Sequence, residues 1–221
     1  MSATDSDKHE RLLVTGAGSF DVELSPLQAR AFRDYLSLLS FWGARLNLTA
    51  IHDEELVIRR HFIDSLSVVP LLSRDGGLLD IGSGAGFPGI PIKLAVPDKP
   101  VYLVEPRRKR ANFLRHVARE LKLTGLHVIE SRIETLAAEG PPPVAETITR
   151  GFSDIRGFLR ISGDLLAQGG ISVLMQGPKG AAVLDDVQGE LPSYGILAER
   201  TASFELPFGG ERRTVLMFRK S

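Results

Sequence analysis

The sequence predicts an α/β protein with a mostly parallel sheet, an antiparallel C-terminal hairpin and an N-terminal helical cap. Three observations predict this class. The first third of the chain places apolar residues at helical spacing, the middle alternates short apolar runs with helical stretches, and the tail holds two consecutive strand patterns. Strand–helix–strand alternation is typical of parallel sheets, whereas consecutive strands pair as antiparallel hairpins.

Composition narrows the class of protein further. The chain has 221 residues, with 27 basic and 27 acidic side chains, 43% hydrophobic residues and no cysteine. Such a chain forms one domain with a proper core, and disulfides, cysteine–zinc sites and thiol nucleophiles are excluded. The zero net charge argues against bulk attraction to nucleic acid or a membrane, but it is compatible with a local basic patch. No apolar stretch approaches a membrane span or a secretory signal, so we expect a soluble cytoplasmic protein.

The N-terminal part divides into two expected segments before the main domain. Residues 1–20 are polar and rich in glycine, serine and threonine, so we expect a flexible leader. Residues 21–72 are expected to form the helical cap, and residues 73–221 the α/β domain.

Two helix starts in the cap are marked by capping residues. Ser25 is an expected N-cap, Pro26 suits the first helical position, and Gln28 completes a capping box. Asp53 is expected to cap a second helix, which Pro70 ends.

Short apolar runs and the helical patterns between them define the α/β domain. The expected parallel strands are 78–81, 101–104, 126–129, 147–149 and 171–175. The expected helices between them are 90–96, 109–121 and 155–166. The tail strands 194–206 and 213–218 complete a sheet of seven strands.

The strongest functional signal is the glycine-rich segment 80–89, which follows the first strand and opens a helix. One interpretation is the dinucleotide fingerprint G-x-G-x-x-G, formed by Gly84, Gly86 and Gly89. Glu105 follows after about 20 residues, the spacing of a ribose-binding acid in that motif.

The other interpretation is Asp-x-Gly-x-Gly-x-Gly, formed by Asp80, Gly82, Gly84 and Gly86. We favour it because the apolar strand ends before Gly82, which would place the turn of a dinucleotide fingerprint two residues late. Pro88 suits a helix start after that turn. A dehydrogenase would also need a substrate domain, for which too little chain remains.

The cofactor that suits this second interpretation is S-adenosylmethionine. It has no phosphate, and it carries a cationic sulfonium and an ammonium group. Asp80 would place a carboxylate near the positive end, and Glu105 would accept hydrogen bonds from both ribose hydroxyls. The alternative is that the two acids only cap the following helices.

The segment Asp80–Pro91 closely resembles the signature of the bacterial small-subunit ribosomal RNA methyltransferase G family, also called glucose-inhibited division protein B. Further segments resemble family motifs in family order over about residues 40 to 219. They are Asn47-Leu48-Thr49, Arg60–Leu66, Lys109-Arg110, Ser131–Glu134, Thr149–Phe152 and Gly210–Arg212.

The resemblance implies a Rossmann-like S-adenosylmethionine-dependent methyltransferase fold. It also implies methylation of N7 of a guanine in the 16S ribosomal RNA of the small subunit. The cofactor contacts that it implies lie at Gly82, Phe87, Ile133, Glu134 and Arg150.

Basic residues supply candidates for RNA contact. Arg107 and Arg108 open the run Arg107–Arg110 beside Glu105, where phosphate contact competes with a solvated helix face. The other candidates are Asn47, His61, Arg132, Lys179 and Arg212. For His61 we favour a helix histidine hydrogen-bonded to a neighbour, and Asn47, His61 and Asp64 together would fix the cap over the cofactor mouth.

The chain departs from the family pattern at two places. Met175-Gln176-Gly177 stands where the family has Leu-Lys-Gly, and Lys179 is a candidate to replace the missing lysine. Arg150-Gly151 stands where the family has Arg-Ala.

The chemistry expected at guanine N7 requires no base, because this atom has a lone pair and no proton. Alignment of the reacting atoms alone can supply ~7–11 kcal/mol. We therefore assign no catalytic side chain. The histidines show no metal-binding spacing, and we expect a monomer without metal or membrane partner. The alternatives are a methyltransferase of this fold acting on a small molecule or protein, an NAD-type oxidoreductase, and a non-catalytic RNA-binding assembly factor.

Overall fold

The computed structural model describes residues 3–73, 75–140, 143–152 and 154–221. These residues form a sheet in the order β3-β2-β1-β4-β5-β7-β6, with parallel pairing from β3 to β5 and antiparallel pairing of β7 with β5 and β6. The strands are β1 (Leu78–Ile81), β2 (Val101–Val104), β3 (Leu126–Ile129), β4 (Val144–Arg150), β5 (Leu166–Gln176), β6 (Ile196–Glu205) and β7 (Arg212–Lys220). The predicted mixed sheet and its C-terminal hairpin are confirmed, and β4 and β5 are longer than expected.

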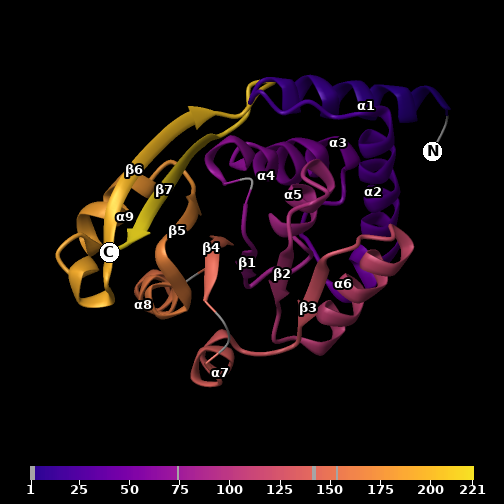
Figure 1. Ribbon diagram of the computed structural model, residues 1–221. Helices are drawn as coiled ribbons and strands as arrows, with labels where there is room; N and C mark the ends of the chain where they lie inside the picture. Colours follow the sequence, from indigo (N-terminus) through magenta and orange to yellow (C-terminus); the bar gives the residue numbers. More distant parts are fainter. Residues whose placement is uncertain (1–2, 74, 141–142, 153) are drawn as a thin grey trace.

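Helices cover both faces of this sheet. The cap contains α1 (Ala3–Gly18), α2 (Pro26–Leu46), α3 (Glu54–Val57), a π-helical stretch (Ile58–Ile63), α4 (Asp64–Leu66) and a 3-10 turn (Val69–Leu71). The α/β domain contains α5 (Gly89–Ala95), α6 (Arg108–Glu120), α7 (Ile133–Ala138), α8 (Ile155–Leu165), α9 (Gly180–Val187) and a second 3-10 turn (Leu191–Tyr194). One core cluster joins the cap, α5 and α6 to the sheet, and a second joins α7, α8 and α9 to it. In Figure 1 the yellow hairpin lies at the end of the sheet opposite β3.

The expectation of a flexible leader at residues 1–20 is wrong for the described part of that segment. Residues Ala3–Gly18 form α1, and the helix buries Leu13 and Ala17 against the cap. The two residues are four apart and therefore share one face of the helix. Residues 1–2 lie outside the described residues. No helix of the described residues is long and apolar enough to cross a membrane.

The predicted helix starts of the cap are confirmed. The backbone N–H of Gln28 donates to Ser25 Oγ at 3.3 Å, and the backbone N–H of Ser25 donates to Gln28 Oε1 at 2.9 Å. Asp53 accepts a bond from the backbone N–H of Leu56 at 2.8 Å. The helix that Asp53 starts differs from the expectation, because a π-helical stretch interrupts it and it ends before Pro70.

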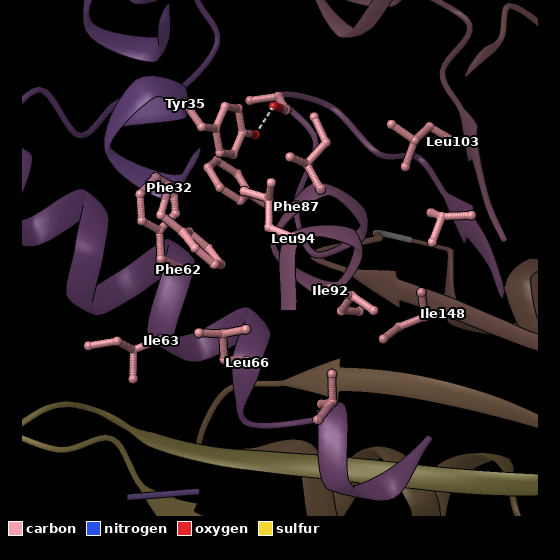
Figure 2. Close-up of a cluster of buried hydrophobic side chains, with 14 of the residues drawn as sticks. Phe32, Tyr35, Phe62, Ile63, Leu66, Phe87, Ile92, Leu94, Leu103 and Ile148 are labelled. Atoms are coloured by element: carbon pink, nitrogen blue, oxygen red, sulfur yellow. Dashed lines mark hydrogen bonds between the residues drawn. The ribbon is translucent and has the colours of Figure 1, made fainter. Parts of the chain in front are cut away.

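Aromatic packing attaches the cap to the glycine-rich turn. Figure 2 shows Tyr35 and Phe62 of the cap beside Phe87, with Phe32 packed against Phe62. The buried Tyr35 hydroxyl donates a hydrogen bond to the carbonyl oxygen of Ala85 at 2.6 Å. The turn is therefore held from the cap side as well as by β1, which limits its freedom to move.

Candidate active site

The glycine-rich turn lies at the carboxyl end of β1, where open α/β sheets bind ligands. Gly82, Gly84 and Gly86 have φ values of +76°, +60° and +104°, in the region that favours glycine. A Cβ atom at Gly82 would also lie 3.3 Å from the Phe152 ring. Glycine at this position keeps the backbone open toward the space in front of the strand.

Asp80 ends β1 and is fully buried. Its Oδ2 accepts a hydrogen bond from the backbone N–H of Gly89 at 2.9 Å, at the start of α5. Its Oδ1 is buried and has no hydrogen-bond partner among the described residues. Burial raises the pKa of Asp80 to about 7. One carboxylate oxygen thus bonds the start of the helix, as the capping alternative has it, while the other has no partner among the described residues.

Glu105 follows β2 and braces the same turn. Its Oε2 accepts from the backbone N–H of Gly84 at 3.0 Å, and its Oε1 accepts from the backbone N–H of Arg107 at 2.8 Å. A carboxylate oxygen can accept more than one hydrogen bond, so both oxygens keep acceptor capacity. The predicted contact with ribose hydroxyls stays a prediction.

A cleft of about 610 Å³ opens in front of β1, β2 and β3. Its walls bring together five of the predicted residues, namely Gly82, Arg107, Arg132, Ile133 and Glu134. The volume is typical of a site for a small molecule. A second cavity of about 610 Å³ lies where β1 and β4 begin, and glycines, aliphatic side chains and Tyr102 line it without a charged group. The first cleft is therefore the better candidate for a charged nucleoside.

Phe87 lies beneath two polar side chains at the border of the cap. The His61 ring stacks on it with a centroid separation of 4.6 Å, and the Arg150 guanidinium carbon lies 5.2 Å from its centroid. Arg150 Nη2 donates to His61 Nδ1 at 2.9 Å, and His61 Nε2 bonds Thr49 Oγ1 at 2.9 Å. Burial, followed by the charge of Arg150, lowers the pKa of His61 to about 3. His61 is therefore hydrogen-bonded to its neighbours, in agreement with the favoured interpretation of a helix histidine bonded to a neighbour.

Asp64 joins the cap to two strands. It is 2% exposed, its Oδ2 accepts from Arg150 Nη1 at 3.2 Å, and its Oδ1 accepts from Arg213 Nε at 3.0 Å. Arg213 also pairs with Glu211 at 2.8 Å. We call His61, Asp64, Arg150 and Arg213 the Asp64 cluster. It joins the cap to the end of β4 and the start of β7, and Asn47, which we grouped with His61 and Asp64, takes no part in these bonds.

The remaining predicted RNA-binding residues are exposed near the same edge of the sheet. Asn47 ends α2, and its carbonyl oxygen accepts from Arg110 Nη2 at 3.2 Å. Arg108 opens α6, Lys179 precedes α9, and Arg212 opens β7. Of these four, none lines the cleft in front of β1 to β3.

Two residues at this site have no assigned role in the sequence analysis. Thr49 lies within a motif and bonds His61, and Arg213 binds Asp64 although its neighbour Arg212 is the predicted residue. Strand alternation places adjacent side chains on opposite faces, so one of the two arginines has to face the cap. Only the register of β7 shows which one does.

Comparison with known proteins agrees with the family resemblance of the sequence motifs. A family model described as rRNA small subunit methyltransferase G matches residues 28–205. A protein from Syntrophus aciditrophicus named Ribosomal RNA small subunit methyltransferase G is 36% identical, covering 96% of this chain and 89% of that protein. One of the same name from Burkholderia multivorans is 40% identical, covering 79% of this chain and 78% of its own length.

Solved structures share the fold at low identity. TrmN from Thermus thermophilus aligns with a TM-score of 0.55 and 18% identity, covering 74% of this chain and 53% of its own. TYW2 from M. jannaschii, solved in complex with AdoMet, aligns with a TM-score of 0.55 and 13% identity, covering 71% of this chain and 73% of its own. The fold is that of the Rossmann-like methyltransferases.

Proposed function

The chain belongs to the rRNA small subunit methyltransferase G family, and we propose that it transfers a methyl group from S-adenosylmethionine to N7 of a guanine in 16S ribosomal RNA. The observation that carries this proposal is the buried Asp80 with one unpartnered oxygen, directly before Ile81 and Gly82, which line the nucleoside-sized cleft at the glycine turn. A substrate in the small ribosomal subunit places this activity in the cytoplasm.

The residues of the cleft suit the cofactor. S-adenosylmethionine supplies an electrophilic methyl group on a cationic sulfur. We assign Asp80 to its positive end, because a buried acid with a raised pKa gains most from a nearby cation. We assign Glu105 to the ribose hydroxyls, and Ile133 and Glu134 to the side of the adenine. Gly82, Gly84 and Gly86 admit the ligand to the backbone.

We assign Phe87 and Arg150 a positioning role beside the cofactor. The bonds of Arg150 go to Asp64, His61 and the carbonyl oxygen of Arg60. We propose that Arg150 holds Phe87 and the cap in position next to the cofactor.

The chain's contribution to methyl transfer is alignment. Guanine N7 has no proton to lose, so no residue has to act as a base before attack. His61 suits this, because both ring nitrogens are already bonded to protein groups. The cap and the cleft hold the two reactants in line and exclude water, which is where the rate enhancement arises.

Arg107, Arg108 and Arg132 are the proposed phosphate contacts: Arg107 and Arg132 line the cleft, and Arg108 follows Arg107 at the start of α6. All three are exposed, and no carboxylate among the described residues pairs with their side chains. Free guanidinium groups beside a cofactor site are suited to binding the backbone of an RNA substrate.

The decisive experiment supplies the purified protein with labelled S-adenosylmethionine and small subunits from cells that lack the gene. We expect label in a single guanosine of 16S ribosomal RNA, identified as N7-methylguanosine by mass spectrometry. Label on a protein or a small molecule would favour the first alternative. Cofactor binding without methyl transfer would favour an assembly factor. Saturation by a nicotinamide dinucleotide in place of S-adenosylmethionine would overturn the proposal.

A further inference from the structure

The C-terminal half of α2 carries an aromatic and cationic surface that we call the α2 patch, formed by Phe41, Trp42 and Arg45. The rings of Phe41 and Trp42 meet nearly at right angles, with centroids 5.1 Å apart. The guanidinium carbon of Arg45 lies 4.5 Å from the Phe41 centroid and 5.9 Å from that of Trp42. These contacts hold the three side chains in a defined arrangement on the surface.

Packing against the rest of the protein accounts for only part of the surface of the three side chains in the α2 patch. Trp42 is half-buried and lies edge-on to His116 of α6, 5.8 Å between centroids. Phe41 is 58% exposed, so folding removes less than half of its surface from water. Arg45 makes no ion pair with any carboxylate among the described residues. An exposed ring beside an unpaired cation contributes little to the core and remains available to a partner.

The α2 patch continues the basic rim of the cofactor cleft. Helices α2 and α6 pack against each other, and Figure 1 shows them close together on the side of β2 and β3. The end of α2 is tied to the start of α6 by the bond from Arg110 to the carbonyl oxygen of Asn47. Phe41 lies six residues before Asn47, which is about 9 Å along a helix. The patch is therefore close enough to the rim for one RNA strand to reach both.

We propose that the α2 patch is a second RNA contact, at which an unpaired base stacks on Phe41 and the guanidinium of Arg45. This rests on the proposed function and extends it to a nucleotide away from the methylated guanine. Unpaired bases are commonly recognised by stacking on aromatic rings and guanidinium planes. Arg108 and Lys109 at the start of α6 are likewise without carboxylate partners in the described chain, so they can neutralise the adjoining phosphates. This excess of positive charge favours RNA over a protein partner.

The first test measures methyl transfer to unmethylated small subunits over a range of subunit concentrations. We expect Phe41→Ala to raise KM about tenfold, which corresponds to about 1.4 kcal/mol. We expect kcat and the Kd of S-adenosylmethionine to stay unchanged in Phe41→Ala. Phe41→Trp, which keeps an aromatic ring at this position, should have the KM of the wild type. Leu27→Ala is the matched control, because Leu27 is 77% exposed at the other end of the same helix. An unchanged KM for Phe41→Ala would overturn the inference.

The second test identifies the partner. A photo-crosslinking amino acid, introduced as Phe41→p-benzoylphenylalanine, is irradiated in the full-length protein bound to small subunits. A cross-linked product that ribonuclease shortens supports the inference, and one that only protease shortens overturns it in favour of a ribosomal protein. Absence of any cross-link, with a cross-link from a rim position such as Arg108 as positive control, also overturns it. A wild-type protein that transfers no methyl would refute the proposed function, whereas the cross-link reports on the α2 patch independently.

Discussion

Replacing Asp64 by asparagine tests whether the Asp64 cluster holds the cap to the sheet. Asparagine keeps the shape of the side chain but removes its charge and turns one acceptor into a donor. Arg150 and Arg213 can only donate, so at least one of the two loses its hydrogen bond to residue 64, and both lose the negative charge between them. We expect a less stable protein in which the cap is held less firmly to β4 and β7.

The size of the effect follows from burial. Removing one partner of a buried ion pair costs about 3–5 kcal/mol in the free energy of unfolding. The side chains of Arg150 and Arg213 are 19% and 14% exposed, so water can partly hydrate them once the carboxylate is gone. We therefore expect a loss at the lower end of this range, about 3 kcal/mol. For a chain of this size such a loss lowers Tm by roughly 6–12 °C.

Denaturant unfolding of wild type and Asp64→Asn measures this difference directly. Glu190→Gln is the control, because Glu190 pairs with Arg156 at 2.8 Å on the surface, where we expect a loss below about 1 kcal/mol. The double variants with Arg150→Met and Arg213→Met should show strong coupling to Asp64. A loss for Asp64→Asn no larger than that of the control would refute the assignment of the cluster as the connection between cap and sheet.

Three further predictions concern charge. The pKa of Asp80 is about 7 in the free protein, and a bound cation lowers it, so the affinity for S-adenosylmethionine should rise as the pH increases through 7. Calorimetry in two buffers of different ionisation enthalpy should detect the release of a proton on binding, and Asp80→Asn should abolish this release. His61 has a pKa of about 3 in the folded protein and of 6.5 in an unstructured peptide, so the unfolded state binds more protons between these two pH values. The free energy of unfolding should therefore fall as the pH drops below 6.5. In His61→Gln, the decrease in the free energy of unfolding between pH 7 and pH 5 should be smaller than in the wild type by about 1–2 kcal/mol. Arg107→Glu with Arg108→Glu should weaken binding to ribosomal RNA and flatten its dependence on salt, and an unchanged slope would contradict phosphate contact.

Much of the α/β domain could be predicted because its signals are local. A buried parallel strand is a short apolar run, and both ends of β1, β2 and β3 fall where the apolar runs indicate. The glycine turn is equally local, since three alternate glycines with positive φ are needed at one place in the chain. The same reasoning explains the capping residues of α2 and α3, which act within a few positions of themselves.

Features that depend on contacts between distant segments could not be predicted. Asp64 meets Arg150 and Arg213, which are 86 and 149 residues away, and no local pattern specifies such pairs. Helix α1 escapes prediction for a related reason. Its polar composition resembles a leader, and its few apolar side chains become informative only when the cap is present to bury them.

The Asp64 cluster also limits the charge beside a site that receives a cation. Arg150 and Arg213 bring two positive charges to the border of the cap, and Asp64 and Glu211 bring two negative charges to the same guanidinium groups. His61, the fourth member of the cluster, stacks on Phe87 of the glycine-rich segment, and its lowered pKa keeps it neutral. A protonated His61 would add a positive charge at the border of the cap and would face Arg150 Nη2 at 2.9 Å. Burial, followed by the charge of Arg150, lowers the pKa of His61, so the packing that holds the cap to the sheet also keeps a further positive charge away from the site of a cationic cofactor.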